Sequence, residues 1–270
     1  KKVITNWAVE SGPNSRFSTT WQTNGAGGQG GIWQSGMGLS SDGQRFFVAT
    51  GNGQGGENQG IPASGQSGCR TLGEAVINLG VDSSTGKISL IDYFQPYDYI
   101  NMDGGDQDFG SGGVSLLDPT VFKGTGVSRL AVTTGKNGKI YIMNADNLGG
   151  YKQGPGQTDL VVQEIITNRA VFGGIGSYPL EGGYIYRYVK AAHRHSRIVV
   201  TCTLRSLSAI NGAFVNCQGI LMRLVFTLVG ATTETSAGRV GPGIPTITTY
   251  KGQAGTAILW STDPDAGLRA

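Results

Sequence analysis

The chain has 270 residues, 46 of them glycine, and only 14% of its residues are charged. Its formal net charge of +3 is too small to argue for a nucleic-acid-binding protein, and lysine and arginine do not alternate with aromatic residues in a basic stripe. The sequence has no run of 18 apolar residues, so we expect no membrane span. Glycine clusters lie between short apolar runs, which favours an all-β protein with many tight turns.

The chain begins inside an apolar run, residues 3–9, without an initiating methionine, which indicates a piece of a longer protein. We expect residues 1–30 to be the outgoing part of an earlier structural unit. Residues 31–52 then read as a Gly/Trp-led strand, an Asp-Gly turn and an apolar strand. Residues 112–118 and 129–135 repeat this plan. Such self-similarity, with short strands and polar turns, predicts the blades of a β-propeller.

The repeat divides the chain into four blade-like blocks. In the first block we expect strands near 45–50, 75–81 and 87–94. Glycine-containing turns at 84–87 and 136–139 are expected to close hairpins. Because a blade cannot bury its faces alone, we predict an incomplete ring whose blades need neighbours. The blocks comprise residues 31–94, 110–167, 172–230 and 238–270.

Residues 187–223 differ in character from the rest of the chain. They carry six Lys or Arg and no acid, both histidines, two of the three cysteines and only two of the 46 glycines. Two interpretations stay open: a real basic insertion, or out-of-character translated sequence such as a retained intron or a shifted frame. In either case we expect poor order and weak packing. His193, His195 and Cys202 match no standard zinc-ligand spacing, which argues against a metal site.

Residues 103–110 hold the densest run of carboxylates in a chain that is poor in charge. Hard cations bind several oxygen ligands, and Asp and Asn side chains supply them. A carboxylate beside a bound cofactor also serves as a general base. The alternative interpretation is an Asp-Gly turn cluster that caps a blade and has no chemical role.

Four segments, in their order along the chain, resemble the quinoprotein alcohol dehydrogenases, eight-bladed propellers that bind pyrroloquinoline quinone (PQQ) and calcium. Residues 31–52 end in Thr-Gly-Asn like a blade of that family, and residues 82–87 have its Asp-x-x-Thr-Gly-Lys repeat. Residues 106–110 resemble its acidic catalytic motif, although Gln107 stands where the family usually has an aromatic residue. Residues 134–142 resemble its Lys/Arg-Asn-Gly-x-x-Tyr blade. The resemblance covers roughly residues 30–186 and 225–268.

Carried over residue by residue, this resemblance implies roles for five side chains. Asp108 would take the proton of the alcohol as the base and would also bind calcium, with Asp106 as its neighbour at the cofactor. Asn52 would be a further calcium ligand. Lys136 would hydrogen-bond to the quinone oxygens, and Trp33 would stack on the quinone ring. The cofactor would accept the hydride and calcium would polarise its carbonyl, while the protein supplies base and orientation.

Three of these residues also have a purely structural interpretation. Trp33 is equally suited to packing within a blade. Asn52 lies between two glycines, where a left-handed turn residue is common. Lys136 precedes an Asn-Gly pair and fits a solvated hairpin lysine.

The sequence therefore favours an all-β fold, a β-propeller of quinoprotein alcohol dehydrogenase type. Its leading function is an extracellular or cell-surface oxidoreductase that acts on a small alcohol or carbohydrate with PQQ and calcium. The alternative is a non-catalytic propeller that binds carbohydrate or protein at its rim through Trp33, Tyr97, Tyr99 and the loop 51–68. A third interpretation, a gene product without function, follows if residues 187–223 are spurious.

Overall fold

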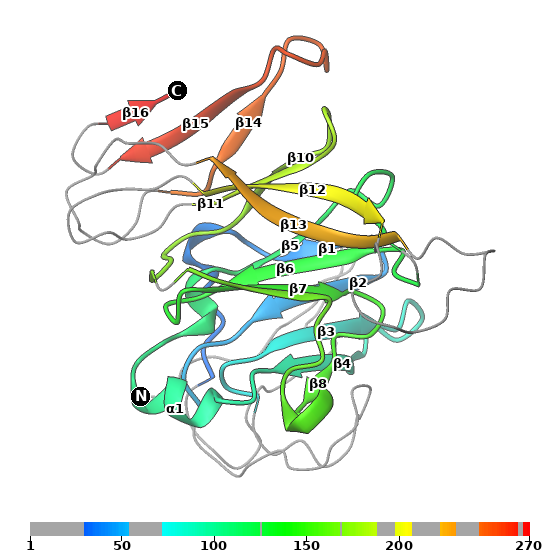
Figure 1. Ribbon diagram of the computed structural model, residues 1–270. Coiled ribbons are helices and arrows are strands. Elements are labelled where there is room, and N and C mark those ends of the chain that lie inside the picture. The colour runs from blue at the N-terminus through cyan, green and yellow to red at the C-terminus, as the bar shows by residue number, and fades with distance from the viewer. Residues whose placement is uncertain are drawn as a thin grey trace, which may run out of the picture.

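The computed structural model of the chain describes residues 30–53, 72–124, 126–167, 169–187, 198–206, 222–230, 243–263 and 267–270. These residues form sheets of five, four, four and three strands, nearly all antiparallel, with almost no helix. This part of the chain is therefore all-β, as the sequence predicts. Figure 1 shows the sheets following one another, from the blue and cyan strands of the first to the red strands of the last. Residues 1–29 and most of the loop 51–68 lie outside the described residues.

Sheet 1 is built from the first apolar strands of the chain. Its strands, in sheet order, are β1 (Ser40–Ser41), β2 (Arg45–Ala49), β3 (Val76–Val81), β4 (Ile88–Gln95) and β8 (Gly150–Tyr151). The β3–β4 hairpin closes as the turn residues predict. Asp82 Oδ1 accepts hydrogen bonds from the backbone N–H groups of Ser84 (2.8 Å) and Thr85 (3.0 Å), and Gly86 has a φ of +68°.

Sheet 2 follows after α1 (Tyr99–Gly104) and contains β5 (Val114–Leu116), β6 (Leu130–Thr134), β7 (Lys139–Asn144) and β9 (Gln163–Ile166), in that order. Short 3-10 turns are η1 (Gln34–Gly36), η2 (Phe109–Ser111) and η3 (Pro155–Gln157). Between β7 and β9 the chain leaves sheet 2, and β8 pairs in parallel with β4 of sheet 1. Among the described residues, no helix has the length and apolar character needed to cross a membrane.

Sheet 3 includes part of the atypical segment 187–223. Its strands are β10 (Gly176–Tyr178), β11 (Tyr184–Arg187), β12 (Ile198–Ser206) and β13 (Met222–Gly230), and sheet 4 contains β14 (Thr246–Thr248), β15 (Ile258–Asp263) and β16 (Gly267–Arg269). β12 lies inside the segment and pairs with both β11 and β13. The remainder of the segment, apart from its first and last residues, lies outside the described residues. Its poor order and its origin therefore stay predictions, as does the division of the chain into four blade-like blocks.

Both faces of sheet 2 are buried. Side chains along a strand point alternately to opposite faces, and β6 and β7 therefore contribute to two cores. The core towards sheet 3 includes Leu130, Val132, Ile140, Ile142, Ile175, Ile185 and Phe226. The core towards sheet 1 includes Ala131, Tyr141, Met143, Phe47, Val76 and Phe94. Burial on both faces explains why these strands are continuous apolar runs rather than alternating ones.

The first strands of successive sheets lie next to one another. The Ser40 hydroxyl of β1 donates a hydrogen bond to the Val114 carbonyl of β5. The Ser115 hydroxyl of β5 in turn donates to the Ile175 carbonyl, just before β10, at 2.6 Å. β10 then contacts β14 of sheet 4. The sheets are thus connected in chain order through their first strands.

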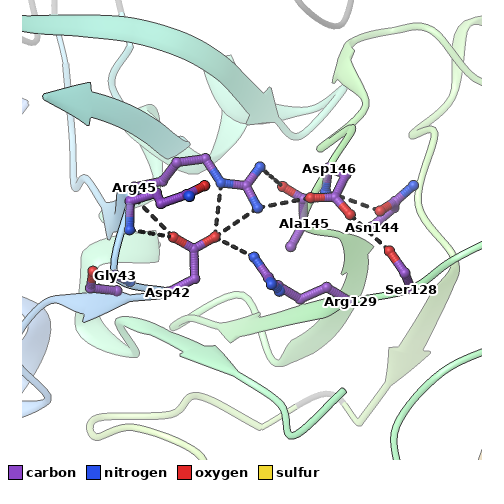
Figure 2. Close-up of polar contacts among 10 residues, drawn as sticks. Asp42, Gly43, Arg45, Ser128, Arg129, Asn144, Ala145 and Asp146 are labelled. Carbon is purple, nitrogen blue, oxygen red and sulfur yellow. Dashed lines mark hydrogen bonds and ion pairs between the residues drawn. The ribbon is translucent and has the colours of Figure 1, made fainter. Parts of the chain in front are cut away.

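An ionic network joins the β1–β2 turn to sheet 2, as Figure 2 shows. Asp42 accepts hydrogen bonds from two backbone N–H groups of its own turn, at 3.0 and 2.8 Å. Its carboxylate also binds the guanidinium groups of Arg45 and, across the interface, Arg129. Arg45 reaches across to Asp146 at 2.8 Å. Burial alone would raise the pKa of Asp42, but the amides and the Arg45 guanidinium outweigh it and hold the pKa at about 2.

Asp42→Asn is expected to lower the free energy of unfolding by roughly 2 kcal/mol at pH 7, because two arginines lose a shared, nearly buried carboxylate. Asp82→Asn is the matched control, because the described hydrogen bonds of Asp82 stay within its own exposed turn. Its effect should be much smaller. Urea unfolding measures both variants, and equal losses would contradict the inter-sheet role of Asp42.

The same network predicts acid sensitivity. An acid whose pKa is lowered on folding stabilises the protein only while it is ionised. The contribution of Asp42 should therefore be complete above about pH 4 and should be lost as the pH falls towards 2. The difference in unfolding free energy between the wild type and Asp42→Asn should shrink over this interval. A difference that stays constant from pH 5 to pH 2.5 would contradict this.

Candidate functional site

Four of the residues singled out in the sequence lie at one end of sheets 1 and 2. Trp33 precedes β1 and Asn52 follows β2, and because these strands are antiparallel both residues lie at the same end. Asp108 precedes β5 and Lys136 follows β6, so sheet 2 places them in the same way. The repeated strand plan thus brings an entry loop and a strand end from each sheet to one place.

The centre of the site is an ion pair between Asp108 and Lys136. Asp108 Oδ2 contacts Lys136 Nζ, while Asp108 Oδ1 accepts a hydrogen bond from the Asn52 backbone N–H at 3.2 Å. The Lys136 backbone N–H donates to the Asp108 carbonyl at 3.2 Å, which ties the two loops together. Asp106, whose side chain is exposed, contacts the same ammonium at 3.1 Å. Burial alone would lower the pKa of Lys136, but the bonds to Asp108 and Asp106 raise it.

Aromatic rings flank the lysine. Lys136 Nζ is 5.8 Å from the ring centre of Trp33 and 5.7 Å from that of Phe172. Trp33 is 44% exposed, so its ring is not packed inside a sheet. Its indole edge lies against Gly51 and Gly110, where an added Cβ would be 3.0 and 2.9 Å from Nε1. These two glycines therefore make room for the indole over the site.

Hydrogen bonds hold the Asn52 side chain through its Nδ2 but not through its Oδ1. Its Nδ2 donates to the Asp103 carbonyl at 3.1 Å, and the neighbouring Gly53 N–H donates to the Asp103 carboxylate at 2.9 Å. Asn52 does not have a positive φ, which disagrees with the left-handed turn interpretation. Its Oδ1 is buried and has no hydrogen-bond partner among the described residues. An oxygen of this kind is a candidate ligand for a bound cation.

Glu74 is a fully buried carboxyl next to the site, two residues before the first residue of β3. Its Oε2 accepts a hydrogen bond from the Phe109 backbone N–H at 2.6 Å. Burial raises the pKa of Glu74 to about 8; the Phe109 amide opposes that rise, while the negative charges of Asp108 and Asp103 add to it. This raised pKa favours the neutral form of the Glu74 carboxyl near pH 7.

These groups suit a polar, planar ligand. A nearly buried carboxylate that a lysine and an amide hold in place is suited to accepting a proton from a hydroxyl. Aromatic rings and a cation together suit a flat anionic molecule. Asn52 and Asp108 offer oxygen ligands to a hard cation, which binds six to eight of them. Within the described ranges, no three His, Cys, Asp or Glu side chains converge as in a protein-built metal site. Calcium at Asn52 would thus need further oxygen ligands.

Sequence reasoning missed two residues of the site and misplaced one. Phe172 and Glu74 carry no motif, because only the packing of the sheets brings them next to Lys136 and Phe109. Tyr99, expected at the rim, is buried with its ring against Tyr151, so that expectation is wrong. An isolated acid directly before an apolar strand was the available signal for Glu74.

Comparison of the sequence with known protein families found no matching family, and comparison with curated proteins found no match. The resemblance noted in the motifs therefore stays a hypothesis.

Gly51→Ala should disturb the site, because the ideal Cβ lies 2.6 Å from Asp108 Oδ1 and 3.0 Å from Trp33 Nε1. The matched control is Gly104→Ala in α1, where a Cβ meets nothing within 4 Å. Gly51→Ala should change acrylamide quenching of tryptophan fluorescence, and Gly104→Ala should not. The variant Trp33→Phe identifies the part of the fluorescence that comes from Trp33. Unchanged quenching in Gly51→Ala would contradict the close packing of indole, glycine and carboxylate.

Glu74→Gln should alter how stability depends on pH. An acid whose pKa rises on folding, here from 4.5 to about 8, destabilises the protein as the pH increases through that interval. The wild type should lose on the order of 1 kcal/mol of unfolding free energy per pH unit there relative to Glu74→Gln, which has no proton to lose. Urea unfolding at pH 5, 6.5 and 8 measures the difference, and parallel curves would contradict it.

Proposed function

We propose that the protein is an oxidoreductase of the quinoprotein type, which oxidises an alcohol or sugar hydroxyl with PQQ and calcium. The observation that carries the proposal is the convergence of Trp33, Asn52, Asp108 and Lys136 from separate loops. A stable fold does not require a nearly buried carboxylate–lysine pair beside an exposed indole. Such a pair beside an exposed aromatic ring suits a ligand site for a flat, charged molecule.

The order of the sheets supports a propeller. Apart from β8, the strands of each sheet follow those of its predecessor in the chain, and the first strands of successive sheets contact one another. Blades of a propeller are arranged in this way around a central axis. In such a ring, the loops that carry Trp33 and Asp108 would face the axis, where propellers of this type hold their ligands.

The residues of the site fit the proposed cofactor in two respects. Asn52 Oδ1 is buried without a partner among the described residues, as expected of an oxygen that binds a cation. Lys136 supplies a positive charge between two aromatic rings, which suits a flat molecule with carboxylates. When bound, the quinone would supply a hydride acceptor. Asp108 would accept the proton of the substrate hydroxyl. The Lys136 ammonium and the Asn52 backbone N–H would hold the Asp108 carboxylate in place.

A calorimetric titration of PQQ into the whole chain, with and without calcium, tests the proposal. We expect saturable binding that needs calcium, and a loss of about tenfold or more in affinity for Lys136→Ala, because the cation facing the ligand is removed. Asp108→Asn should lower the kcat of alcohol oxidation with an artificial electron acceptor about 100-fold or more, because the proton acceptor is lost. Asp118→Asn is the control, because Asp118 bonds to Thr120 in an exposed turn. A folded wild type that binds no PQQ would overturn the proposal.

The second candidate function is carbohydrate binding at the rim. It is favoured by the exposure of Trp33 (44%) and Tyr97 (41%), which lie at the same end of the sheets. Exposed aromatic rings stack on sugar rings, and Lys139 lies 5.4 Å from the Tyr97 ring centre as a polar neighbour. If PQQ does not bind, oligosaccharide titration of the wild type and Trp33→Ala decides this alternative.

A further inference from the structure

Glu74 lies next to the site and belongs to none of the sequence motifs described above. It lies between Gly73 and β3, with its side chain fully buried. Its backbone N–H donates to the Gly51 carbonyl at 2.9 Å, and its Oε2 accepts from the Phe109 N–H at 2.6 Å. One residue therefore contacts both segments that carry the proposed ligand groups: Gly51 precedes Asn52, and Phe109 follows Asp108.

The backbone around Glu74 is fixed on both sides. Glu74 has a φ of +50°. Residues other than glycine adopt this left-handed backbone conformation only where the surrounding structure imposes it. Gly73 passes so close to Gly53 that an added Cβ would lie 2.5 Å from its Cα. The Ala75 N–H donates to the Thr50 hydroxyl at 3.0 Å. The backbone that carries the Glu74 side chain is thus held in place, and the carboxyl reaches the Phe109 amide from this fixed position.

The second carboxyl oxygen gives an independent observation. Glu74 Oε1 is buried and has no hydrogen-bond partner among the described residues. An ionised carboxylate in such a place would have one oxygen unsolvated and would lie near the negative charges of Asp108 and Asp103. A neutral carboxyl carries no charge to desolvate or to be repelled, although Oε1 still has no partner among the described residues, and Oε2 still accepts the Phe109 hydrogen bond.

We propose that Glu74 is a positioning residue for Asp108: its carboxyl holds the Phe109 amide and so keeps the Asp108 carboxylate against Lys136 and the Asn52 amide. The inference rests on the proposed function for its catalytic consequence. The positioning itself does not depend on which ligand the site binds. Glu74 touches neither substrate nor cofactor in this role and acts through the backbone at residues 108–109.

Two variants separate positioning from packing. Glu74→Met has a similar volume but no acceptor for the Phe109 N–H, whereas Glu74→Gln keeps a neutral acceptor. Amide hydrogen exchange at Phe109, measured by NMR, should be about tenfold or more faster in Glu74→Met and close to wild type in Glu74→Gln. Unchanged exchange in Glu74→Met would overturn the inference whether or not the protein is an enzyme. Glu74→Ala replaces Glu74→Met if the latter does not fold.

The catalytic consequence is tested in a double-mutant cycle with Asp108→Asn. Glu74→Met should lower kcat about 10- to 100-fold with KM nearly unchanged, Glu74→Gln should restore most of it, and Glu74→Met should add little to Asp108→Asn. Equal losses in both backgrounds would indicate a merely structural role and overturn the inference. If the wild type binds no PQQ, the proposed function fails, and hydrogen exchange alone decides the role of Glu74.

Discussion

The burial of sheet 2 on both faces is the constraint on which the rest of the structure depends. A β-sheet with apolar side chains on both sides is stable only between two other layers, and here sheets 1 and 3 provide them. Because the layers meet face to face, the loops at the strand ends of neighbouring sheets come close together. The candidate site consists of such loops, so its geometry follows from the packing of the cores.

Sheets 1 and 2 are held together differently at their two ends. At one end, Asp42 and Arg129 join the β1–β2 turn to the start of β6 in a network of fully matched charges. At the other end, the polar groups are less well matched, since Asn52 Oδ1 and Glu74 Oε1 lack partners among the described residues. Unsatisfied buried polar atoms are unfavourable for stability, and natural proteins tolerate them where a ligand or a reaction needs them.

The sequence predicts features that depend on neighbouring residues in the chain. The Asp82 turn and the Asn-Gly hairpin before Lys139 follow from local chemistry, and the sheets contain them. Glu74 and the burial of Tyr99 were not predictable in this way, because both depend on contacts between elements far apart in the sequence. The ring closure of a propeller and the role of residues 187–223 stay predictions.

The short strand β8 has a consequence for how the protein can be divided. The chain leaves sheet 2 after β7, adds two residues to the outer edge of sheet 1 and then returns as β9. If the polypeptide were cut between the two sheets, β4 would have an unpaired edge, and β8 would stay attached to sheet 2 without its pairing partner. These sheets are therefore not interchangeable modules, and any recombination or duplication that respects the fold has to carry both together.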